Sequence, residues 1–270
     1  MYRSRKPRSL VASLAVAIAL MAVMVAPSSA ITHGQLDGNG HPHVGIMVAK
    51  DAAGNPLWRC SGTLLSSTVY LTAGHCTEPP AASAEVWFDA DEATIRANGY
   101  PFGGASSVTG AVHTHPDYNP NAFFLRDVGV VVLDTPVNTG GVYGSLPAID
   151  SLDQLATKRG KQEVWFTAVG YGLQYINPVV VQADLNRMVA YPKLDQINVP
   201  GFVGDFSLLL SNNAKTGGTC FGDSGGPNFL GSSTTVAAVT SFGINNCTGV
   251  GGVFRMDRVW AHDWVSSFLP

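Results

Sequence analysis

The apolar residues of this 270-residue chain fall in short runs that are separated by Gly, Pro, Asn and Asp. Short apolar runs with turn residues at both ends are typical of β-strands. The clearest of them are residues 44–49, 69–72, 128–133, 164–169 and 236–239. Apolar residues at helical spacing occur near the C-terminal end, in segment 256–268. The pattern therefore predicts an all-β protein that ends in one α-helix.

The N-terminal segment has the composition of a secretory signal peptide. Four basic residues between positions 3 and 8 precede an uncharged apolar run, 10–25, and Ser28-Ser29-Ala30 offers the small residues that signal peptidase needs. Such a run is short for a bilayer core of roughly 30 Å, and an uncleaved signal anchor is the alternative. We therefore expect removal of residues 1–30 and a secreted, extracellular product without membrane attachment.

Charge excludes one class of partner. Removal of residues 1–30 takes away four basic residues and no acidic one, which leaves 12 Lys and Arg against 19 Asp and Glu. With a net charge of −7 the chain has no excess of basic residues with which to bind nucleic acid. The hydrophobic fraction of 46% excludes a disordered chain. The Gly-, Pro- and Ser-rich stretch 138–147 is the expected boundary between two halves.

Four cysteines, Cys60, Cys76, Cys220 and Cys247, lie in the exported part of the chain. Pairing in an oxidising compartment is chemically reasonable, and the sequence alone leaves three connectivities open. Zinc is the competing use of four cysteines. No pair of them has the close C-x-x-C spacing of structural zinc sites, so disulfides are favoured.

Other residues that could hold a metal ion form incomplete sets. The histidines at 41 and 43, or those at 113 and 115, could act as metal pairs, but nothing nearby completes a ligand set. Asp89, Asp91 and Glu92 form an acidic cluster that lacks the Gly and the ring of oxygen ligands of a calcium loop. We therefore expect no metal site and interpret these residues as parts of solvated loops.

Candidate catalytic residues concentrate in three segments. His75 ends an apolar strand, where a lone histidine is more often structural than catalytic. Asp127 opens the apolar run 128–133, and a half-buried carboxylate needs a hydrogen-bonding partner unless it simply forms a turn. Ser224 lies in Gly222-Asp223-Ser224-Gly225-Gly226-Pro227. Its flanking glycines favour a tight turn whose N–H groups converge on an oxyanion over a plain Gly-rich loop.

Together these segments resemble the chymotrypsin-like serine proteases. Thr72-Ala73-Gly74-His75-Cys76 and the Ser224 segment are similar to two signature blocks of that family, and Asp127 resembles the third. The chain order His, Asp, Ser is also the family's order. The resemblance extends over residues 31–270 and implies two six-stranded antiparallel Greek-key β-barrels. They would span 31–145 and 146–270, the second with the C-terminal α-helix, and form one monomeric peptidase domain.

The resemblance implies a serine endopeptidase that hydrolyses polypeptide substrates through an acyl-enzyme and needs no cofactor. Ser224 would be the nucleophile, His75 the general base and then acid, and Asp127 the group that orients and stabilises the imidazolium. The backbone N–H groups of Gly222 and Ser224 would form the oxyanion hole. The cysteine pairs that the resemblance implies are Cys60 with Cys76 and Cys220 with Cys247.

The resemblance also gives a role to the new N-terminus. Active members of the family have a free N-terminal Ile or Val whose ammonium pairs with the Asp beside the nucleophile, here Asp223. Cleavage after Ala30 would expose Ile31 in this way. We therefore expect signal peptidase to release an enzyme that needs no further activation, although Thr32-His33-Gly34 replaces the usual Val-Gly-Gly.

A substrate pocket follows from the same resemblance. Trypsin-like members carry an Asp where this chain has Gly218, so no anion is available there for a substrate Lys or Arg. We therefore expect a specificity that is not trypsin-like, with a large apolar or aromatic side chain before the scissile bond. The residues expected to contact the substrate are Gly218, Thr219, Ser241, Phe242, Gly243 and Gly252.

Two other classes compete with this interpretation. An α/β-hydrolase esterase would also match G-x-S-x-G at residues 222–226, but in that fold a helix starts at the serine and the acid and histidine follow it. Gly225-Gly226-Pro227 would break such a helix, and 46 residues remain after Ser224. A non-catalytic binding protein that keeps the protease fold would normally have lost one of the three catalytic residues, all of which are present here.

Overall fold

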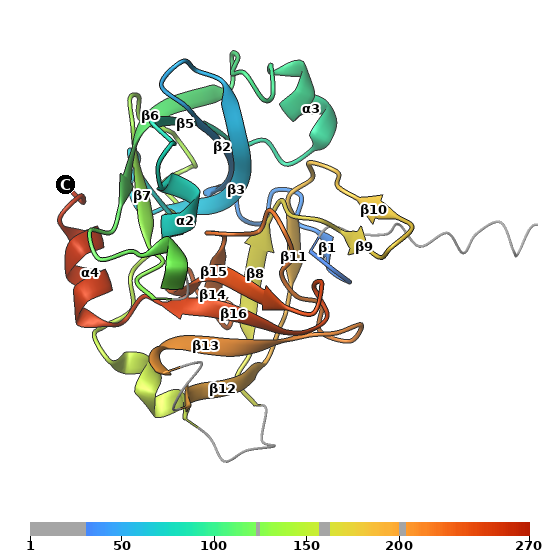
Figure 1. The fold of residues 1–270 in the computed structure, drawn as a ribbon, viewed down its shortest axis with the longest axis vertical. Coiled ribbons are helices and arrows are strands. Elements are labelled where there is room, and N and C mark those ends of the chain that lie inside the picture. Colours follow the sequence, from blue (N-terminus) through green and yellow to red (C-terminus); the bar gives the residue numbers. More distant parts are fainter. Residues whose placement is uncertain (1–30, 123–124, 157–162, 200–203) are drawn as a thin grey trace, which may run out of the picture.

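The computed structural model describes residues 31–122, 125–156, 163–199 and 204–270. The predicted signal peptide, residues 1–30, lies outside them. Two β-structures lie side by side, and helix α4 (Val259–Ser266) packs against the first of them (Figure 1). In that contact the ring of Trp264 lies 5.1 Å from the ring of His115. The helix falls within segment 256–268, where the sequence predicts it.

The first β-structure is a closed barrel of six antiparallel strands. In barrel order they are β2 (Val44–Lys50), β3 (Pro56–Leu64), β4 (Val69–Thr72), β7 (Gly129–Leu133), β6 (Ser107–Thr114) and β5 (Ser83–Trp87). Three of the predicted apolar runs supply β2, β4 and β7, because strands buried on both faces read as continuous apolar runs. Short helices lie in the connections: α2 (Gly74–Thr77), α3 (Glu92–Ala97) and the 3₁₀ turn η1 (Pro120–Ala122).

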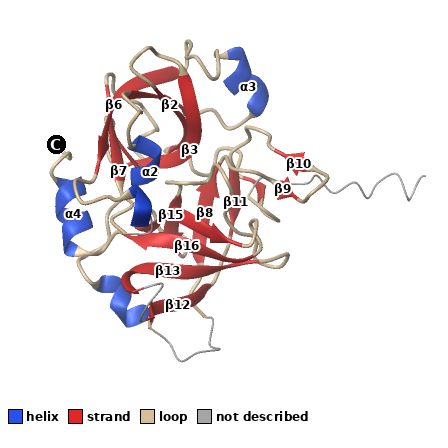
Figure 2. Cartoon of the chain, in the orientation of Figure 1, coloured by secondary structure: helices blue, strands red, loops and turns tan. Residues whose placement is uncertain are grey.

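The second β-structure contains eight strands. Their order is β1 (Gln35–Leu36), β11 (Met188–Ala190), β8 (Phe166–Gly170), β14 (Pro227–Leu230), β15 (Val236–Ile244), β16 (Gly249–Arg255), β13 (Gly204–Asn212) and β12 (Leu194–Val199). A two-stranded hairpin, β9 (Tyr175–Ile176) with β10 (Val181–Gln182), and the 3₁₀ turn η2 (Ser151–Leu155) lie in the connections (Figure 2).

Strands β11 and β12 are two parts of one strand that is interrupted near Pro192, a residue without an N–H for the ladder. β11 pairs with β8, and β12 pairs with β13. Between them the carbonyl of Pro192 accepts Phe166 N–H at 2.9 Å, and the carbonyl of Lys193 accepts Ser211 N–H at 2.9 Å. The interrupted strand thus closes the second structure into a six-stranded barrel, to which β1 adds at one side. The predicted fold class is confirmed.

The boundary between the barrels stays a prediction. The stretch 138–147 lies in the connection from β7 to β8. The segment that precedes the first barrel crosses to the second, because β1 pairs with β11. The N-terminal part of the described chain is therefore built into both barrels.

One buried cation joins the two barrels. Arg187, directly before β11, is fully buried, and its Nε donates to Asp37 Oδ2 at 2.9 Å. Its terminal nitrogens donate to the carbonyls of Gly38 at 2.7 Å, Val44 at 3.1 Å and Phe88 at 3.0 Å. A buried guanidinium needs a carboxylate and further acceptors to offset its loss of water. The N-terminal segment and the first barrel supply them here.

Replacement of Arg187 by Met should lower the free energy of unfolding by about 3–5 kcal/mol, because it breaks a buried ion pair and leaves His41 as the remaining side-chain partner of the buried Asp37 carboxylate. Arg187→Met combined with Asp37→Leu should regain part of that loss. Arg96→Met is the matched control, since Arg96 pairs with Glu92 at the surface and exposed pairs contribute about 0.2–1 kcal/mol. Urea denaturation measures each variant. A loss for Arg187→Met no larger than that of the control would contradict this role.

Candidate active site

Three loops bring the predicted catalytic residues to the junction of the two barrels. His75 lies on α2, just after β4, and Asp127 lies two residues before β7, both on the first barrel. Ser224 lies in the second barrel, between β13 and β14. Figure 2 shows α2 where the two barrels meet. His75 and Ser224 line the same cavity, which has a volume of about 430 Å³.

Asp127 fixes the orientation of His75. The Asp127 carboxylate is fully buried, and its Oδ1 accepts the backbone N–H of His75 at 2.8 Å. Its Oδ2 lies 2.9 Å from His75 Nδ1 and accepts a further bond from Ser241 Oγ of β15 at 2.5 Å. Because a carboxylate oxygen accepts, Nδ1 carries the proton in this contact. Nε2 of the neutral ring then keeps its lone pair, as a general base requires.

The surroundings of His75 make it more basic. Burial alone would lower the pKa of His75, but the charge and hydrogen bond of Asp127, together with the charge of Glu78, raise that pKa above its usual value. Glu78 lines the cavity three residues after His75. Burial raises the pKa of Glu78. The charge of His75 offsets part of this rise, and the charge of Asp127 adds to it. Two acidic side chains therefore stabilise the protonated form of His75.

Ser224 lies on a tight turn that depends on its glycines. Gly222 and Gly225 have φ angles of 93° and 76°, a region that favours glycine, and a Cβ at Gly225 would overlap Thr72 Oγ1. The carbonyl of Ser224 accepts the N–H of Ser61 at 2.8 Å. Strand β14 follows the turn, so no helix starts at the serine. This arrangement excludes the α/β-hydrolase alternative.

The two predicted oxyanion donors are backbone N–H groups of the turn that carries Ser224. Neither Gly222 N–H nor Ser224 N–H donates a hydrogen bond among the residues that the structure describes. Within the same residues, no hydrogen bond joins Ser224 Oγ to His75; in substrate-free sites such bonds are often long and tighten on binding. The cavity is lined by the residues that carry a hydroxyl and a basic nitrogen, Ser224 and His75, whereas Gly222 is not among its lining residues.

Asp223, next to Ser224, is a second buried carboxylate. Its Oδ1 accepts Gly172 N–H at 2.7 Å, and its Oδ2 accepts Cys220 N–H at 2.8 Å. Burial raises the pKa of Asp223 to about 7 despite these bonds and the nearby charge of Arg59. In the uncleaved chain the nitrogen of Ile31 belongs to a peptide bond, so the partners of Asp223 are the two backbone N–H groups.

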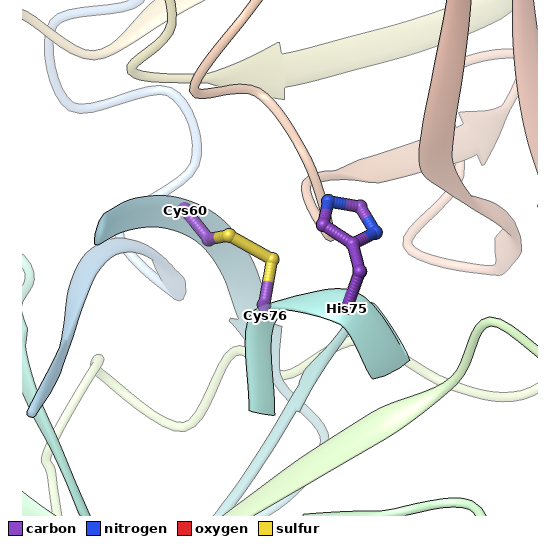
Figure 3. Close-up of side chains that lie close together, drawn as sticks. All are labelled: Cys60, His75 and Cys76. Carbon is purple, nitrogen blue, oxygen red and sulfur yellow. A yellow bond between two sulfur atoms is a disulfide. The ribbon is translucent and has the colours of Figure 1, made fainter. Parts of the chain in front are cut away.

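Two disulfides support the loops of the site. Cys60 of β3 is joined to Cys76 of α2, and Cys220 is joined to Cys247. Figure 3 shows the first disulfide beside the ring of His75. Cys60, His75 and Cys76 lie close enough to suggest a metal site, but both sulfurs are bonded to each other and are not thiolate ligands.

Four of the predicted substrate residues line the cavity: Thr219, Ser241, Phe242 and Gly243. Gly218 and Gly252 do not. A Cβ at Gly218 would overlap the side chain of Asn212, and one at Gly252 would overlap the ring of Phe242. The glycine of β16 that faces Thr219 is Gly251. A Cβ added at Gly251 would lie 3.2 Å from Thr219 Oγ1. Pairing of β15 with β16 is irregular between Thr240 and Phe242, and Gly252 lies opposite Phe242.

Sequence reasoning missed several residues of the cavity. They are Glu78, Tyr118, Pro120 and Phe221, together with Thr240. Glu78 had a usable signal, because an acid three residues after a catalytic histidine lies on or beside the same short helix. Tyr118 and Pro120 had none, since they precede Asp127 in a loop whose path no local pattern predicts.

The trypsin family model matches residues 37–265 of the chain. This chain belongs to the trypsin family. The resemblance inferred from the His75, Asp127 and Ser224 segments is thereby confirmed, and it covers both barrels and α4 of this family member.

Curated relatives of this trypsin-family chain include proteases of several animals. A collagenase of Hypoderma lineatum is 24% identical over 76% of this chain and 74% of its own length. Brachyurin of Leptuca pugilator is 29% identical over 85% of this chain and 93% of its own length.

Solved structures show the same fold. A structure titled HL collagenase has a TM-score of 0.64 and 20% identity, over 88% of this chain and 97% of that one. A mutant of human heparin binding protein has a TM-score of 0.63 and 17% identity, over 88% and 96%. Among the described residues of this trypsin-family chain, no helix combines the length and apolar character that crossing a bilayer requires.

Replacement of Glu78 by Gln should lower the pKa of His75, because it removes one of the two negative charges that stabilise the imidazolium. NMR titration of the His75 ring measures the change directly. Glu92→Gln, on helix α3, is the control, and it should leave the His75 titration in place. An unchanged or raised pKa in Glu78→Gln would show that Glu78 does not act on His75.

Proposed function

We propose that this chain is a secreted serine endopeptidase with His75, Asp127 and Ser224 as its catalytic triad. The observation that carries the proposal is the bond of buried Asp127 to His75 Nδ1, beside a cavity that Ser224 also lines. Membership of the trypsin family supports it, since relatives carry the names collagenase, brachyurin and trypsin. The enzyme would comprise residues 31–270 as one extracellular, monomeric peptidase domain that acts on polypeptides.

The reaction follows from the geometry of the cavity. Ser224 Oγ attacks the carbonyl carbon of the scissile bond, and its proton passes to His75 Nε2 while Asp127 stabilises the imidazolium. The carbonyl oxygen becomes an oxyanion that accepts the N–H groups of Gly222 and Ser224. His75 gives the proton to the leaving nitrogen, and the C–N bond breaks to leave an acyl-enzyme. Water then loses a proton to His75 and attacks the ester, and Ser224 recovers the proton.

The cavity lining supports an uncharged residue before the scissile bond. Phe221 and Phe242 contribute aromatic surface, and Thr219 and Ser241 are neutral. Glu78 is the one acid among the lining residues, and it belongs to the His75 side of the cavity, at the end of α2. The specificity that fits is for a large apolar or aromatic side chain.

A non-catalytic binding protein is the competing function, because similar structures bear the name heparin binding protein. That likeness concerns the fold alone. Residues 31–270 carry 12 basic against 19 acidic side chains, and a net negative charge opposes binding of a polyanion. The pairing of Asp127 with His75 also orients a general base, which catalysis needs and binding alone does not.

Ser224→Ala should lower kcat by on the order of 10⁶-fold, because it removes the attacking oxygen. Hydrolysis of a peptide library and labelling by a serine-directed fluorophosphonate should disappear together. Ser232→Ala, an exposed serine of the loop between β14 and β15, is the matched control and should retain both signals. A folded wild-type chain beginning at Ile31 that neither labels nor cleaves would refute the proposal and favour the binding protein.

Release of Ile31 is proposed to complete the site. Ile31 shares a buried cluster with Ala168 of β8, and a Cβ at Gly170 would overlap Asp223 Oδ1. Ala168 and Gly170 are two residues apart, so they face the same side of that strand. An ammonium formed at Ile31 would therefore arise near a buried carboxylate that has N–H donors but no ammonium partner.

This pairing has a measurable pH signature. With Ala30 retained, the pKa of Asp223 is about 7, above its unfolded value of 3.8, so the folded chain binds more protons between these values. Its free energy of unfolding should therefore fall as the pH rises from about 4 to about 7. In a chain that begins at Ile31, the ammonium lowers the pKa of Asp223, and this part of the fall should disappear.

Urea denaturation across this pH range compares the two chains, in which all other titrating side chains are the same. Asp223→Asn in the chain with Ala30 retained should also abolish this part of the fall. An equal decline with pH in the chains beginning at Ala30 and at Ile31 would rule out the Ile31–Asp223 pair.

A further inference from the structure

A buried amide is bonded to the backbone of a residue that lines the cavity. Asn212 ends strand β13 and is 2% exposed. A Cβ added at Gly218 would overlap the Cβ, Cγ and Oδ1 atoms of Asn212. The Asn212 side chain therefore occupies the volume into which any side chain at position 218 would extend. The neighbouring residue, Thr219, lines the cavity itself.

Two hydrogen bonds fix the orientation of this amide. Asn212 Nδ2 donates to the carbonyl of Thr219 at 2.8 Å, and Asn212 Oδ1 accepts from Thr32 Oγ1 at 2.8 Å. The assignment of nitrogen and oxygen is determined by chemistry, because a carbonyl oxygen can only accept and must face the NH₂ group. The remaining amide oxygen then faces the hydroxyl of Thr32, which has a proton to donate.

Thr32 connects the amide to the rest of the pocket wall. Its Oγ1 also lies 3.1 Å from the carbonyl of Gly218 and 3.4 Å from that of Cys247. A hydroxyl has a single proton, so the shortest contact, to Asn212, takes most of it. The backbone adds a further link, since Gly218 N–H donates to the carbonyl of Thr32 at 3.1 Å. We call Thr32, Asn212, Gly218 and Thr219 the floor cluster.

We propose that Asn212 is a specificity-determining residue, whose neutral amide closes the floor of the cavity, and that Thr32 is the positioning residue that holds it. This inference rests on the proposed endopeptidase function and identifies its substrate class as peptides with an uncharged side chain before the scissile bond. A Lys or Arg whose end group reached past Thr219 would meet an amide whose oxygen is already bonded to Thr32. Burial of that cation without an anion is unfavourable. The amide also limits how deep an apolar side chain can reach.

The first test changes the charge at the floor without changing its size. In Asn212→Asp the hydroxyl of Thr32 can still donate to a carboxylate oxygen. The ratio of kcat/KM for matched peptides with Arg or Phe before the scissile bond should shift toward Arg by roughly ten- to a hundredfold, the range for a hydrogen bond to a charged group. Asn212→Ala should not favour Arg. An unchanged Arg-to-Phe ratio in a folded, active Asn212→Asp enzyme would overturn the inference.

The second test uses the shared volume and decides the question if Asn212→Asp does not fold. Gly218→Asp alone should destabilise the protein, because its carboxylate would overlap Asn212. Gly218→Asp combined with Asn212→Gly should restore the stability and cleave Arg peptides. If adding Asn212→Gly to Gly218→Asp restores no stability and gives no preference for Arg peptides, Asn212 does not form the floor.

The role of Thr32 is tested by Thr32→Val, which keeps the shape and removes the hydroxyl. KM for the preferred peptide should rise several-fold with kcat nearly unchanged, and Thr32→Ser should restore KM. If kcat falls as much as KM rises in both Thr32→Val and Thr32→Ser, the role of Thr32 is merely structural. Fluorophosphonate titration of each enzyme separates this inference from the proposed function: an unlabelled wild type refutes the endopeptidase, whereas labelled variants with unchanged selectivity refute the floor cluster alone.

Discussion

The structure depends most on the burial of the Asp127 carboxylate. A carboxylate without access to water must find donors inside the protein, and Asp127 finds them on both barrels. The backbone and ring of His75 come from the first barrel, and the hydroxyl of Ser241 comes from the second. Satisfying one buried group therefore holds the two barrels in register at the point where the cavity forms. The nucleophile loop joins the same arrangement through the bond from Ser61 N–H to the carbonyl of Ser224.

The N-terminal segment is the second element that both barrels share. Within seven residues it places Ile31 in the core beside β8, Thr32 under the cavity and Asp37 against Arg187. Each of these positions meets a buried partner that is distant in sequence. A segment with so many buried contacts cannot be exchanged for another without a cost in both barrels. Its first residues therefore link the proposed release of Ile31 to the contacts that shape the substrate cavity.

The sequence predicted the parts of the site whose chemistry is local. His75 and Ser224 are framed by neighbours that the reaction itself needs, and the glycines beside Ser224 allow the turn that presents it. Strand runs such as 128–133 were also readable, because burial on both faces leaves a continuous apolar stretch. The floor of the cavity was not readable, since Thr32 and Asn212 are 180 residues apart and neither stands in a distinctive pattern. Gly252 was expected to contact the substrate and does not line the cavity, and the irregular pairing of its strand with β15 has no signature in composition.

The two buried carboxylates near Ser224 differ in how completely they are satisfied. Asp127 has three donors, one of which belongs to a ring that can take up a proton. Asp223 has two backbone N–H groups, and burial raises its pKa to about 7. A group in that position gains more from a new cation than one that is already paired. Because the Asp223 carboxylate accepts the N–H groups of Gly172 and Cys220, a change in its protonation acts first on those two hydrogen bonds, the second of which lies in the loop that carries Ser224.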